Sequence, residues 1–548
     1  MKEFFDQRLK RGLVRRLNNL KIASVAREVV RKELKPGGAP VIFFKASTGI
    51  DDLSWNSGFH LLASWAFRLQ GIPVVYFACD SGLSKCVLGT NRDDPHKEMP
   101  CKSCTYQSKT LYTSVKTFNV QTSTSKVEGQ RSGVSWFDLH RDPELEKAIS
   151  GLDIEHLSSL TFHDLPLGAL CLPGLRWVLR IHHLSDDEPT RYLLREYILS
   201  AWNVAQKFDA LLDQTQPRAV VVFNGQFFPE ATVRYTAQKR GLRVITHEVG
   251  LQPATAYFTE GEATAYPITI PESFEMNDEQ NVKLDAYLAK RFQGDFTMAG
   301  IKFWTDMKGL DESFLKKAAG FKQIVPVFTN VIFDTSQPHA NTVFEDMFDW
   351  LDLVLEEIRL HPETLFVIRA HPDESRVRKS SRETVEGWVS SRGVDKEANV
   401  IFVGPKESLS SYELILKSKF VMVYNSTIGL EASIVGAAVL CAGKARFTQY
   451  PIVFFPQTIE DVRRKMKEFL AAESIDIPLQ FKRNARRFLY YQLFKTSLPF
   501  GDFLEPSVRV TQTKLKSFGL NELSPARSET MKVIMEGVLD GGIFLLME

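Results

Sequence analysis

The stretch VMVYNSTIGLEASIVGAAVL (421–440) carries the pattern that decides the fold. With the residues on either side, it comprises an apolar run of strand length at 420–426, an apolar segment of helix length at 427–436 and a second strand-like run at 437–443. Gly436 ends the helical segment. Strand, helix and strand in this order are typical of a parallel βαβ unit. We therefore expect this region to lie in a doubly wound parallel sheet.

The same alternation continues outward in both directions. In the second half of the chain we expect strands at 324–330, 365–372 and 399–404, and helices at 346–360, 410–419, 459–472 and 481–494. In the first half we expect strands at 41–46, 74–79, 219–225 and 243–250, and helices at 59–70, 187–214 and 228–241. Helices alternating with strands in this way predict an α/β fold of two Rossmann-type halves.

A chain of 548 residues is long enough for two or three domains. The predicted segments are an N-terminal helical segment at 1–36, a first Rossmann-like domain at 37–270, a helical linker at 271–320, a second Rossmann-like domain at 321–475, and closing helices with a tail at 476–548. Within the first domain, 80–135 is rich in Gly, Pro, Ser and Lys and contains clustered cysteines. We interpret it as a loop-like insertion.

The charge balance limits the function classes. The 68 basic residues nearly match the 66 acidic ones, which argues against a protein built around nucleic-acid binding. Charges interrupt the first twenty residues, where a secretory signal needs an apolar region. No apolar run approaches the roughly 20 residues of a membrane span. We expect a cytoplasmic protein, with peripheral contact of the basic N-terminus with the cytoplasmic membrane as an alternative.

Polar side chains follow the strand expected at 365–372. Arg369 and His371 lie at its carboxyl end, and Pro372 disfavours helical backbone at His371. Open α/β sheets bind ligands at this edge, and an imidazole there can donate to a phosphate oxygen. The alternative is a histidine that only caps a loop.

The strand expected at 420–426 ends in Asn425 and Ser426, and Thr427 opens the next helix. A helix N-terminus offers backbone N–H groups and the positive end of the dipole, which suit a phosphate. Glu431 lies one turn beyond Thr427 on the same face. Because its helix is largely apolar and an unpaired buried carboxylate is costly, we expect Glu431 to have a partner, either in the protein or in a ligand.

These residues carry a resemblance to a known family. IRAHP (368–372), followed some fifty residues later by YNSTIGLEA (424–432), resembles the C-terminal half of the capsule polysaccharide biosynthesis family. The similarity runs from about 324 to 450 and includes FTNVIFDTS (328–336). It implies a bacterial glycosyltransferase of GT-B architecture, with two Rossmann-like halves facing a cleft. The helix at 481–494 resembles the C-terminal crossover of that architecture.

The resemblance also implies roles for individual residues. The second domain would bind the nucleotide donor and the first the acceptor. His371, Ser426 and Thr427, beside Asn425, would hold the nucleotide phosphates, with Arg369 or Arg446 adding positive charge. Glu431 would contact the ribose. The sequence contains no Asp-x-Asp triplet of the kind that holds a metal-bound diphosphate, so we expect a metal-independent transfer without a cofactor.

Transfer to a hydroxyl also needs a general base. The best candidates are in THEVGL (246–251), where His247 and Glu248 end a strand of the first half. They would face the same cleft if the GT-B architecture holds. The choice between the two residues stays open, and so does the alternative of a strand-end pair on the surface.

Four of the six cysteines, Cys79, Cys86, Cys101 and Cys104, cluster within twenty-six residues, and the last two form a C-x-x-C pair. In a cytoplasmic chain this spacing favours metal or redox chemistry over a structural disulfide. Zinc is the first choice, an iron–sulfur cluster is the alternative, and the metal would be structural.

The leading hypothesis is a glycosyltransferase that moves a sugar from a nucleotide-sugar donor to a growing capsule-like polysaccharide or glycolipid. The expected partners are that donor, a glycan or glycolipid acceptor, and a peripheral contact with the inner membrane or a polysaccharide export complex, without nucleic acid. Two alternatives remain. One is a CDP-alditol phosphotransferase of the same fold, and the other is a non-catalytic polysaccharide-assembly or binding protein.

Overall fold

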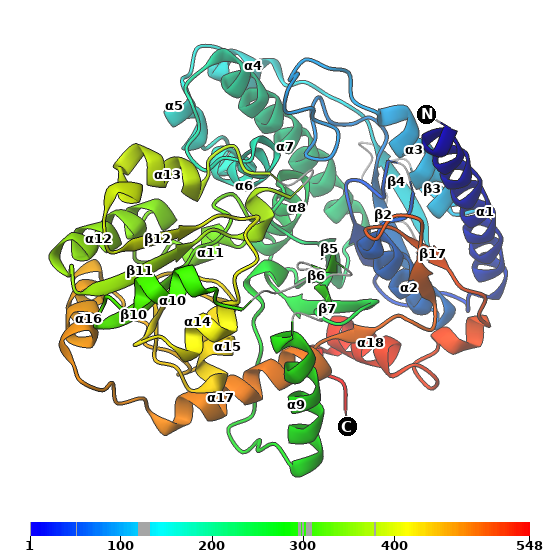
Figure 1. Cartoon of the computed structure of the whole chain (residues 1–548). Helices are drawn as coiled ribbons and strands as arrows, with labels where there is room; N and C mark the ends of the chain where they lie inside the picture. The colour runs from blue at the N-terminus through cyan, green and yellow to red at the C-terminus, as the bar shows by residue number, and fades with distance from the viewer. Residues whose placement is uncertain are drawn as a thin grey trace.

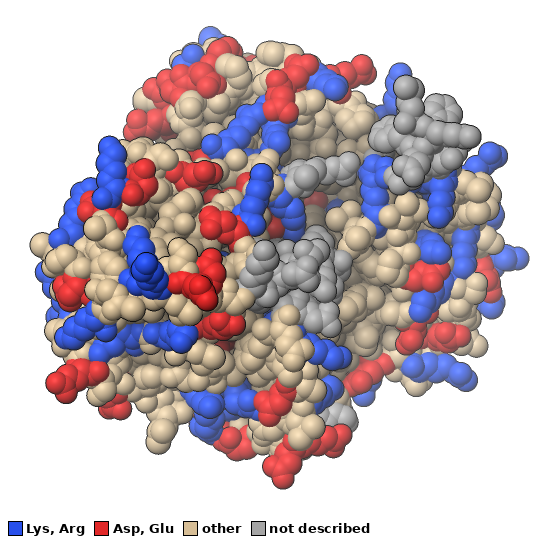
Figure 2. Space-filling model, in the orientation of Figure 1, with Lys and Arg blue, Asp and Glu red and all other residues tan. Residues whose placement is uncertain are grey.

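The computed structural model describes residues 2–50, 52–118, 132–293, 297–298, 301–302, 309–376 and 380–547. Its elements gather into two lobes, each built around one sheet (Figure 1). Basic and acidic side chains are interspersed over the face shown in Figure 2, as the near-zero net charge leads one to expect. Parts of the predicted insertion (119–131) and of the predicted linker (294–296, 299–300 and 303–308) lie outside the described residues.

The first lobe contains an eight-stranded sheet in the order β15-β7-β6-β5-β1-β2-β4-β3. Its strands are β1 (Val41–Phe44), β2 (Val74–Cys79), β3 (Lys116–Phe118), β4 (Gly133–Phe137), β5 (Ala219–Phe223), β6 (Val244–Val249), β7 (Thr255–Glu260) and β15 (Leu498–Pro499). The six strands from β6 to β3 pair in parallel, and β7 and β15 close one edge in antiparallel fashion.

Helices cover both faces of this sheet, so β1 and β5 are almost wholly apolar. One face packs against α1 (Lys2–Lys32), α2 (Trp55–Leu69) and α18 (Glu529–Asp540). The other packs against α4 (Pro143–Ile149), α5 (Ile154–Ser158), α6 (Leu167–Leu179), α7 (Glu188–Thr215) and α8 (Phe228–Lys239). The predicted insertion at 80–135 is more ordered than expected, because it contains α3 (Cys101–Leu111), β3 and the start of β4.

The second lobe contains a five-stranded, fully parallel sheet in the order β12-β11-β10-β13-β14. Its strands are β10 (Gln323–Phe328), β11 (Thr364–Arg369), β12 (Val400–Val403), β13 (Val421–Val423) and β14 (Val439–Cys441). The chain runs outward from β10 to β12 on one side and then crosses back to β13 on the other. The strand order therefore reverses between β10 and β13, where open α/β sheets have their ligand crevice.

Helices also cover both faces of the second sheet. One core contains α12 (Met347–Leu360), α13 (Val385–Arg392) and α16 (Ile459–Ala471). The other contains α9 (Asp278–Phe292), α10 (Glu312–Ala318), α14 (Ser411–Leu416), α15 (Ile428–Val435) and α17 (Leu479–Tyr490). The smaller elements are α11 (Gln337–Ala340), β8 (Thr297–Met298), β9 (Ile301–Lys302), β16 (Leu504–Pro506), β17 (Thr513–Leu515) and the short helical turns η1 (Ala263–Ala265), η2 (Pro372–Glu374), η3 (Val394–Lys396), η4 (Arg446–Gln449), η5 (Tyr491–Lys495) and η6 (Leu520–Leu523). Two parallel, helix-covered sheets confirm the predicted GT-B-like fold class.

The chain passes between the lobes twice. The forward connector at 266–270 lies on the second lobe, where the backbone N–H of Ile268 donates to the Gln449 Oε1 (2.9 Å) and that of Ile270 to the Tyr450 hydroxyl (2.7 Å). The return runs through α17 and η5 to β15, which pairs with β7, and α18 then packs under the first sheet (Figure 1). No helix in the described ranges has both the length and the apolarity to cross a bilayer.

A buried ion pair fixes α9 to the second lobe. The Arg291 guanidinium donates to Oε1 of Glu431 in α15 through Nε (2.8 Å) and Nη2 (2.5 Å), and the Tyr412 hydroxyl donates to Oε2. The two charged side chains are only 10% and 4% exposed. Removing one partner of such a pair leaves an uncompensated buried charge, whose cost exceeds that of losing a surface pair.

The Arg291→Met substitution is therefore expected to lower the free energy of unfolding by about 3–5 kcal/mol. The matched control is Arg483→Met, which breaks the pair with Glu275, where both side chains are at least half exposed. That change is expected to cost at most about 1 kcal/mol. Urea unfolding of the three proteins measures both values, and equal losses in the two variants would contradict the assignment.

A second buried carboxylate should make stability depend on pH. Glu374 in η2 is 3% exposed and accepts a hydrogen bond from the backbone N–H of Val385. Burial raises the pKa of Glu374 to about 8. The folded state then holds a proton that the unfolded state releases above its ordinary pKa, so stability falls as the pH rises from about 4.5 to about 8.

The Glu374→Gln variant removes this titration. Its stability relative to the parent protein is expected to rise by about 3 kcal/mol between pH 5 and pH 8. The Glu460→Gln substitution, at an exposed carboxylate, is the matched control for the loss of a surface charge. Urea unfolding at both pH values measures the difference, and a constant offset for Glu374→Gln would contradict the assignment.

Candidate active site

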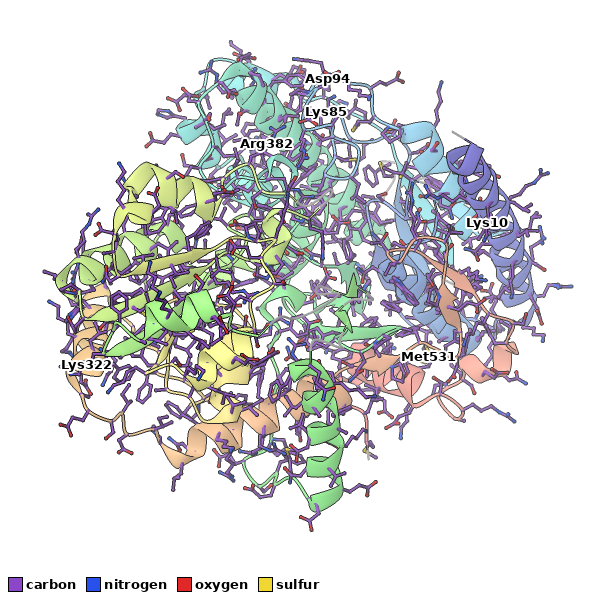
Figure 3. All side chains as sticks on the ribbon, viewed as in Figure 1. Lys10, Lys85, Asp94, Lys322, Arg382 and Met531 are labelled. Atoms are coloured by element: carbon purple, nitrogen blue, oxygen red, sulfur yellow. The ribbon has the colours of Figure 1, made fainter. Side chains whose placement is uncertain are left out.

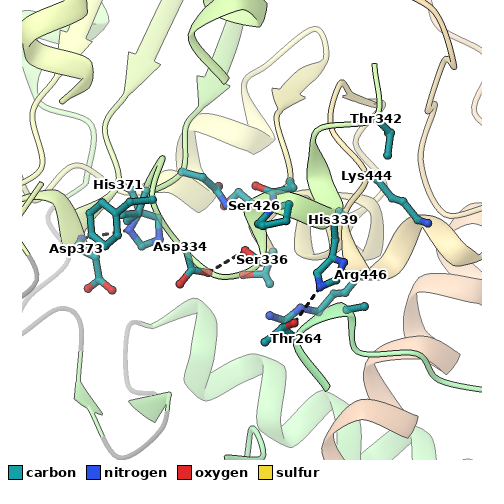
Figure 4. A pocket seen from close by; sticks show the side chains of 18 of the residues that line it. Thr264, Asp334, Ser336, His339, Thr342, His371, Asp373, Ser426, Lys444 and Arg446 are labelled. Carbon is teal, nitrogen blue, oxygen red and sulfur yellow. Dashed lines mark hydrogen bonds between the residues drawn. The ribbon is translucent and has the colours of Figure 1, made fainter. Parts of the chain in front are cut away.

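A cavity of about 620 Å³ lies between the lobes, at the carboxyl ends of the strands of the second sheet. Asn330, His371, Asn425 and Lys444 follow β10, β11, β13 and β14 and line it (Figure 4). Thr264, Ala265, Pro267 and Trp177 of α6 line it from the side of the first lobe. The cleft therefore coincides with the reversal of strand order between β10 and β13.

His371 lies where the sequence places it, at the strand-to-loop corner after β11. Its Nδ1 accepts a hydrogen bond from the backbone N–H of Asp373 (3.2 Å). A neutral imidazole that accepts at Nδ1 carries its proton on Nε2. His371 can therefore act as a hydrogen-bond donor toward an anion in the cleft.

Asn425, Ser426 and Thr427 also line the cleft, at the start of α15. The first N–H groups of a helix lack an intrahelical acceptor, and Thr427, the N-cap residue, makes no capping hydrogen bond with its side chain. Within the described residues, the buried Oδ1 atoms of Asn330 and Asn425 have no hydrogen-bond partner. The ends of β10 and β13 thus present polar groups whose hydrogen-bonding capacity is not used by the protein.

Two basic side chains follow β14. Lys444 is exposed in the cleft, and the Arg446 guanidinium lies 4.2 Å from the centroid of the Tyr266 ring. Tyr266 stacks on Tyr257 of the first lobe, so Arg446 is held over an aromatic pair that belongs to the connector side. Arg446 was predicted from the sequence, whereas Lys444 was not. The segment GKARF (443–447), which directly follows a strand, could have indicated Lys444 as well.

The structure does not bring two of the predicted residues into the cleft lining. Arg369 is buried, and its guanidinium donates to the backbone carbonyl of Leu409. Both oxygens of Glu431 are bound by Arg291 and Tyr412. The expected partner of Glu431 is therefore found in the protein, and its contact with a ribose stays a prediction without support from these contacts.

The two residues predicted as the general base, His247 and Glu248, lie in different environments. His247 is fully buried, and its Nε2 lies 3.0 Å from Nδ1 of His60. Burial lowers the pKa of His247 to about 3, so the ring is neutral. Glu248 is half-buried and accepts from Nδ2 of Asn224 (2.5 Å) and from its neighbouring backbone N–H (3.0 Å). Burial also raises the pKa of Glu248. Neither residue is among those that line the cleft.

Other cleft residues were missed by the sequence analysis. Asp334 is an exposed carboxylate in the loop after β10, and the Ser336 hydroxyl donates to it (2.8 Å) (Figure 4). His339 of α11 spans the lobes, with its Nε2 2.9 Å from the Thr264 hydroxyl and 3.3 Å from Oε2 of Glu262. Asp334 lies in a loop and His339 in the four-residue helix α11, and neither segment is long enough to show a periodic pattern. Only the folded chain therefore identifies them.

The four clustered cysteines line a second cavity of about 370 Å³ in the first lobe. In the part of the chain that the structure describes, no group of three or more His, Cys, Asp or Glu side chains is arranged to hold a metal ion. The predicted zinc or iron–sulfur site therefore stays a prediction.

Comparison with known proteins gives one family match. The family model described as capsule polysaccharide biosynthesis protein matches residues 303–453. This segment contains β10, β11, β13 and β14 and the cleft residues at their ends. No curated protein sequence matches the chain.

Among solved structures, the chain is similar to two KpsC transferases of Thermosulfurimonas dismutans. The beta Kdo 2,4 transferase is 11% identical, with 51% of this chain and 80% of that chain covered and a TM-score of 0.32. The beta Kdo 2,7 transferase is 13% identical, with 60% and 88% covered and a TM-score of 0.31.

A UDP-GlcNAc 2-epimerase from Neisseria meningitidis, bound to UDP-GlcNAc, is 15% identical, with 53% of this chain and 80% of that chain covered and a TM-score of 0.25. The family match is more direct than these distant likenesses, because it falls on the strands and loops that build the cleft. Residues 303–453 of this chain are thus similar to the capsule polysaccharide biosynthesis family.

Proposed function

We propose that the cleft binds a nucleotide sugar and that the protein transfers its sugar to a growing cell-surface glycan or glycolipid. The observation that carries the proposal is the convergence of His371, Lys444, Arg446 and the N-terminus of α15 on one cavity. This set combines a hydrogen-bond donor, two cations and a helix dipole, which together suit a diphosphate. The family match at 303–453 supports the same chemistry.

The donor fits the cleft in size and polarity. A cavity of about 620 Å³ lies within the range of roughly 300–1,000 Å³ found for small-molecule sites. The phosphates would lie between Ser426, Thr427 and the basic pair, while the amide oxygens of Asn330 and Asn425 accept from donor hydroxyl or base N–H groups. Charge on the leaving diphosphate would be stabilised by fixed cations and dipoles, so the proposed transfer needs no metal.

The acceptor hydroxyl needs a base that reaches it directly. We place this role on Asp334, because its carboxylate lies in the cleft beside the phosphate-facing residues. Glu248, the base predicted from the sequence, is held by Asn224 outside the cleft lining and would act as a positioning residue of the first lobe. The acceptor is expected to approach from the side of Trp177 and Thr264.

Donor binding tests the phosphate site. The Lys444→Ala/Arg446→Ala double substitution is expected to raise the Kd for the donor nucleotide about 10- to 100-fold, because two charge-assisted contacts are lost. Lys322→Ala, at the outer edge of the second lobe (Figure 3), is the matched charge control and should leave the Kd unchanged. Calorimetric titration with UDP, GDP, CMP and CDP measures the effect, and a double variant that binds like the parent protein would place the phosphates elsewhere.

Turnover tests the base. With the sugar donor found by a screen of UDP-, GDP-, CMP- and CDP-activated sugars, Asp334→Asn is expected to lower kcat by about 100-fold or more. The donor Kd should stay within about threefold, because Asp334 is not assigned to the phosphates. Glu248→Gln is expected to retain most of kcat. The reverse pattern would restore Glu248 as the base, and a protein that binds nucleotides but transfers none of the activated sugars would refute the proposed enzyme.

A further inference from the structure

The four cysteines of the first lobe line one cavity. Cys79 ends β2, Cys86 lies in the loop that follows, and Cys101 and Cys104 lie in the first turns of α3. All four line the cavity of about 370 Å³, together with mainly apolar side chains, among them Leu83, Val87, Met99, Phe223 and Phe227. All four are thiols without a disulfide partner. The four thiols come from three separate chain segments and meet at one apolar cavity. Such convergence is unusual for cysteines that only fill a hydrophobic core.

Two of the sulfurs have the same local setting. The backbone N–H of Gly82 donates to Sγ of Cys79, and that of Gly89 donates to Sγ of Cys86, each at 3.2 Å. Each glycine follows its cysteine by three residues. A Cβ on Gly89 would lie 3.0 Å from the Cys86 sulfur, and a Cβ on Gly82 would lie 2.4 Å from the Phe137 ring. The glycines thus allow two turns that aim N–H groups at sulfur, an arrangement that stabilises thiolate ligands.

The other two sulfurs lie at a helix N-terminus. Cys101 is the first residue of α3, and Cys104 follows it by three positions on the same face. The first turn contains no acidic residue, and Pro100 at the N-cap makes no side-chain capping bond. The positive end of the helix dipole therefore lies beside these sulfurs. Lys45, a buried cation on the same cavity, adds positive charge beside them.

The size of the cavity bears on the centre that such ligands can hold. A single zinc ion draws its four sulfurs to about 2.3 Å, so it would fill only a small part of the space. The cysteines line a cavity of about 370 Å³, which is large enough for several atoms. An iron–sulfur cluster supplies its own inorganic sulfides and is held by four peripheral cysteine thiolates.

We propose that Cys79, Cys86, Cys101 and Cys104 bind an iron–sulfur cluster that stabilises the first lobe. Each thiol releases its proton as it ligates iron. The cluster would tie the end of β2, the loop at 80–100 and the start of α3 into one unit. Trp177 lines both this cavity and the donor cleft, so the cluster would lie directly behind the acceptor-side wall. The proposal does not depend on the proposed function, because the ligands are separate from the phosphate site.

The test uses the full chain, purified without oxygen and reconstituted with sulfide and equal amounts of ferric and ferrous iron, which match the average oxidation state of an oxidised [4Fe–4S] cluster. For a [4Fe–4S] cluster, we expect about four irons and four acid-labile sulfides per chain, with visible absorbance that bleaches on reduction. The Cys101→Ser/Cys104→Ser variant should contain about tenfold less iron per chain than the parent protein, because two of the four ligands are removed. Cys171→Ala, which removes a buried thiol of the same lobe outside the cavity, is the matched control and should retain full iron content.

A cooperative urea-unfolding transition shows whether a variant has folded. The double variant should still unfold cooperatively, while hydrogen exchange in α3 and β2 increases. Stoichiometric zinc without iron after anaerobic reconstitution would overturn the cluster. A chain that binds neither metal, or iron content that is unchanged in the double variant, would overturn the site itself. None of these outcomes bears on the donor cleft, so failure here and failure of the transferase proposal are distinguishable.

Discussion

The reversal of strand order between β10 and β13 is the constraint on which the rest of the structure depends. Connections that leave these neighbouring parallel strands go to opposite faces of the sheet, so a crevice remains at their carboxyl ends. Asn330 and Asn425 lie at this crevice because they follow β10 and β13. His371 and Lys444 are added by the two strands that flank them. The polarity of the cleft is thus a consequence of topology, and the capsule-family segment coincides with it.

The second lobe could be predicted well from the sequence, because its strands are continuous apolar runs. β10, β11, β13 and β14 and the start of α15 all lie within two or three residues of the expected bounds. His371, Asn425, Ser426 and Thr427 reached the cleft because a strand end fixes where its next residues lie. Short segments were harder. The five residues of β4 give too little alternation to be recognised beside the polar loop at 80–135.

The predicted residues that lie outside the cleft lining have partners that are distant in sequence. Arg369 ends a strand like His371, but its guanidinium is used by the carbonyl of Leu409. Glu431 was expected to have a partner, yet nothing in the sequence connects it to Arg291, 140 positions away. His247 and Glu248 lie near the end of β6, which pairs along its length with β7, and His247 contacts His60 of α2. A periodic sequence pattern predicts which face of a helix or strand is buried. The hydrogen-bond partners of a polar side chain depend instead on which distant segments of the chain pack against it.

The clamped connector at 266–270 has a consequence for motion. Ile268 and Ile270 are hydrogen-bonded to the second lobe. The preceding two residues are bonded to the first lobe, because the Tyr266 hydroxyl donates to the carbonyl of Val249 and the carbonyl of Pro267 accepts from the Tyr257 hydroxyl. The connector is thus attached to both lobes within a few residues. A change in the angle between the lobes would have to break one of these two sets of hydrogen bonds, so the structure favours a cleft of fixed width on this side.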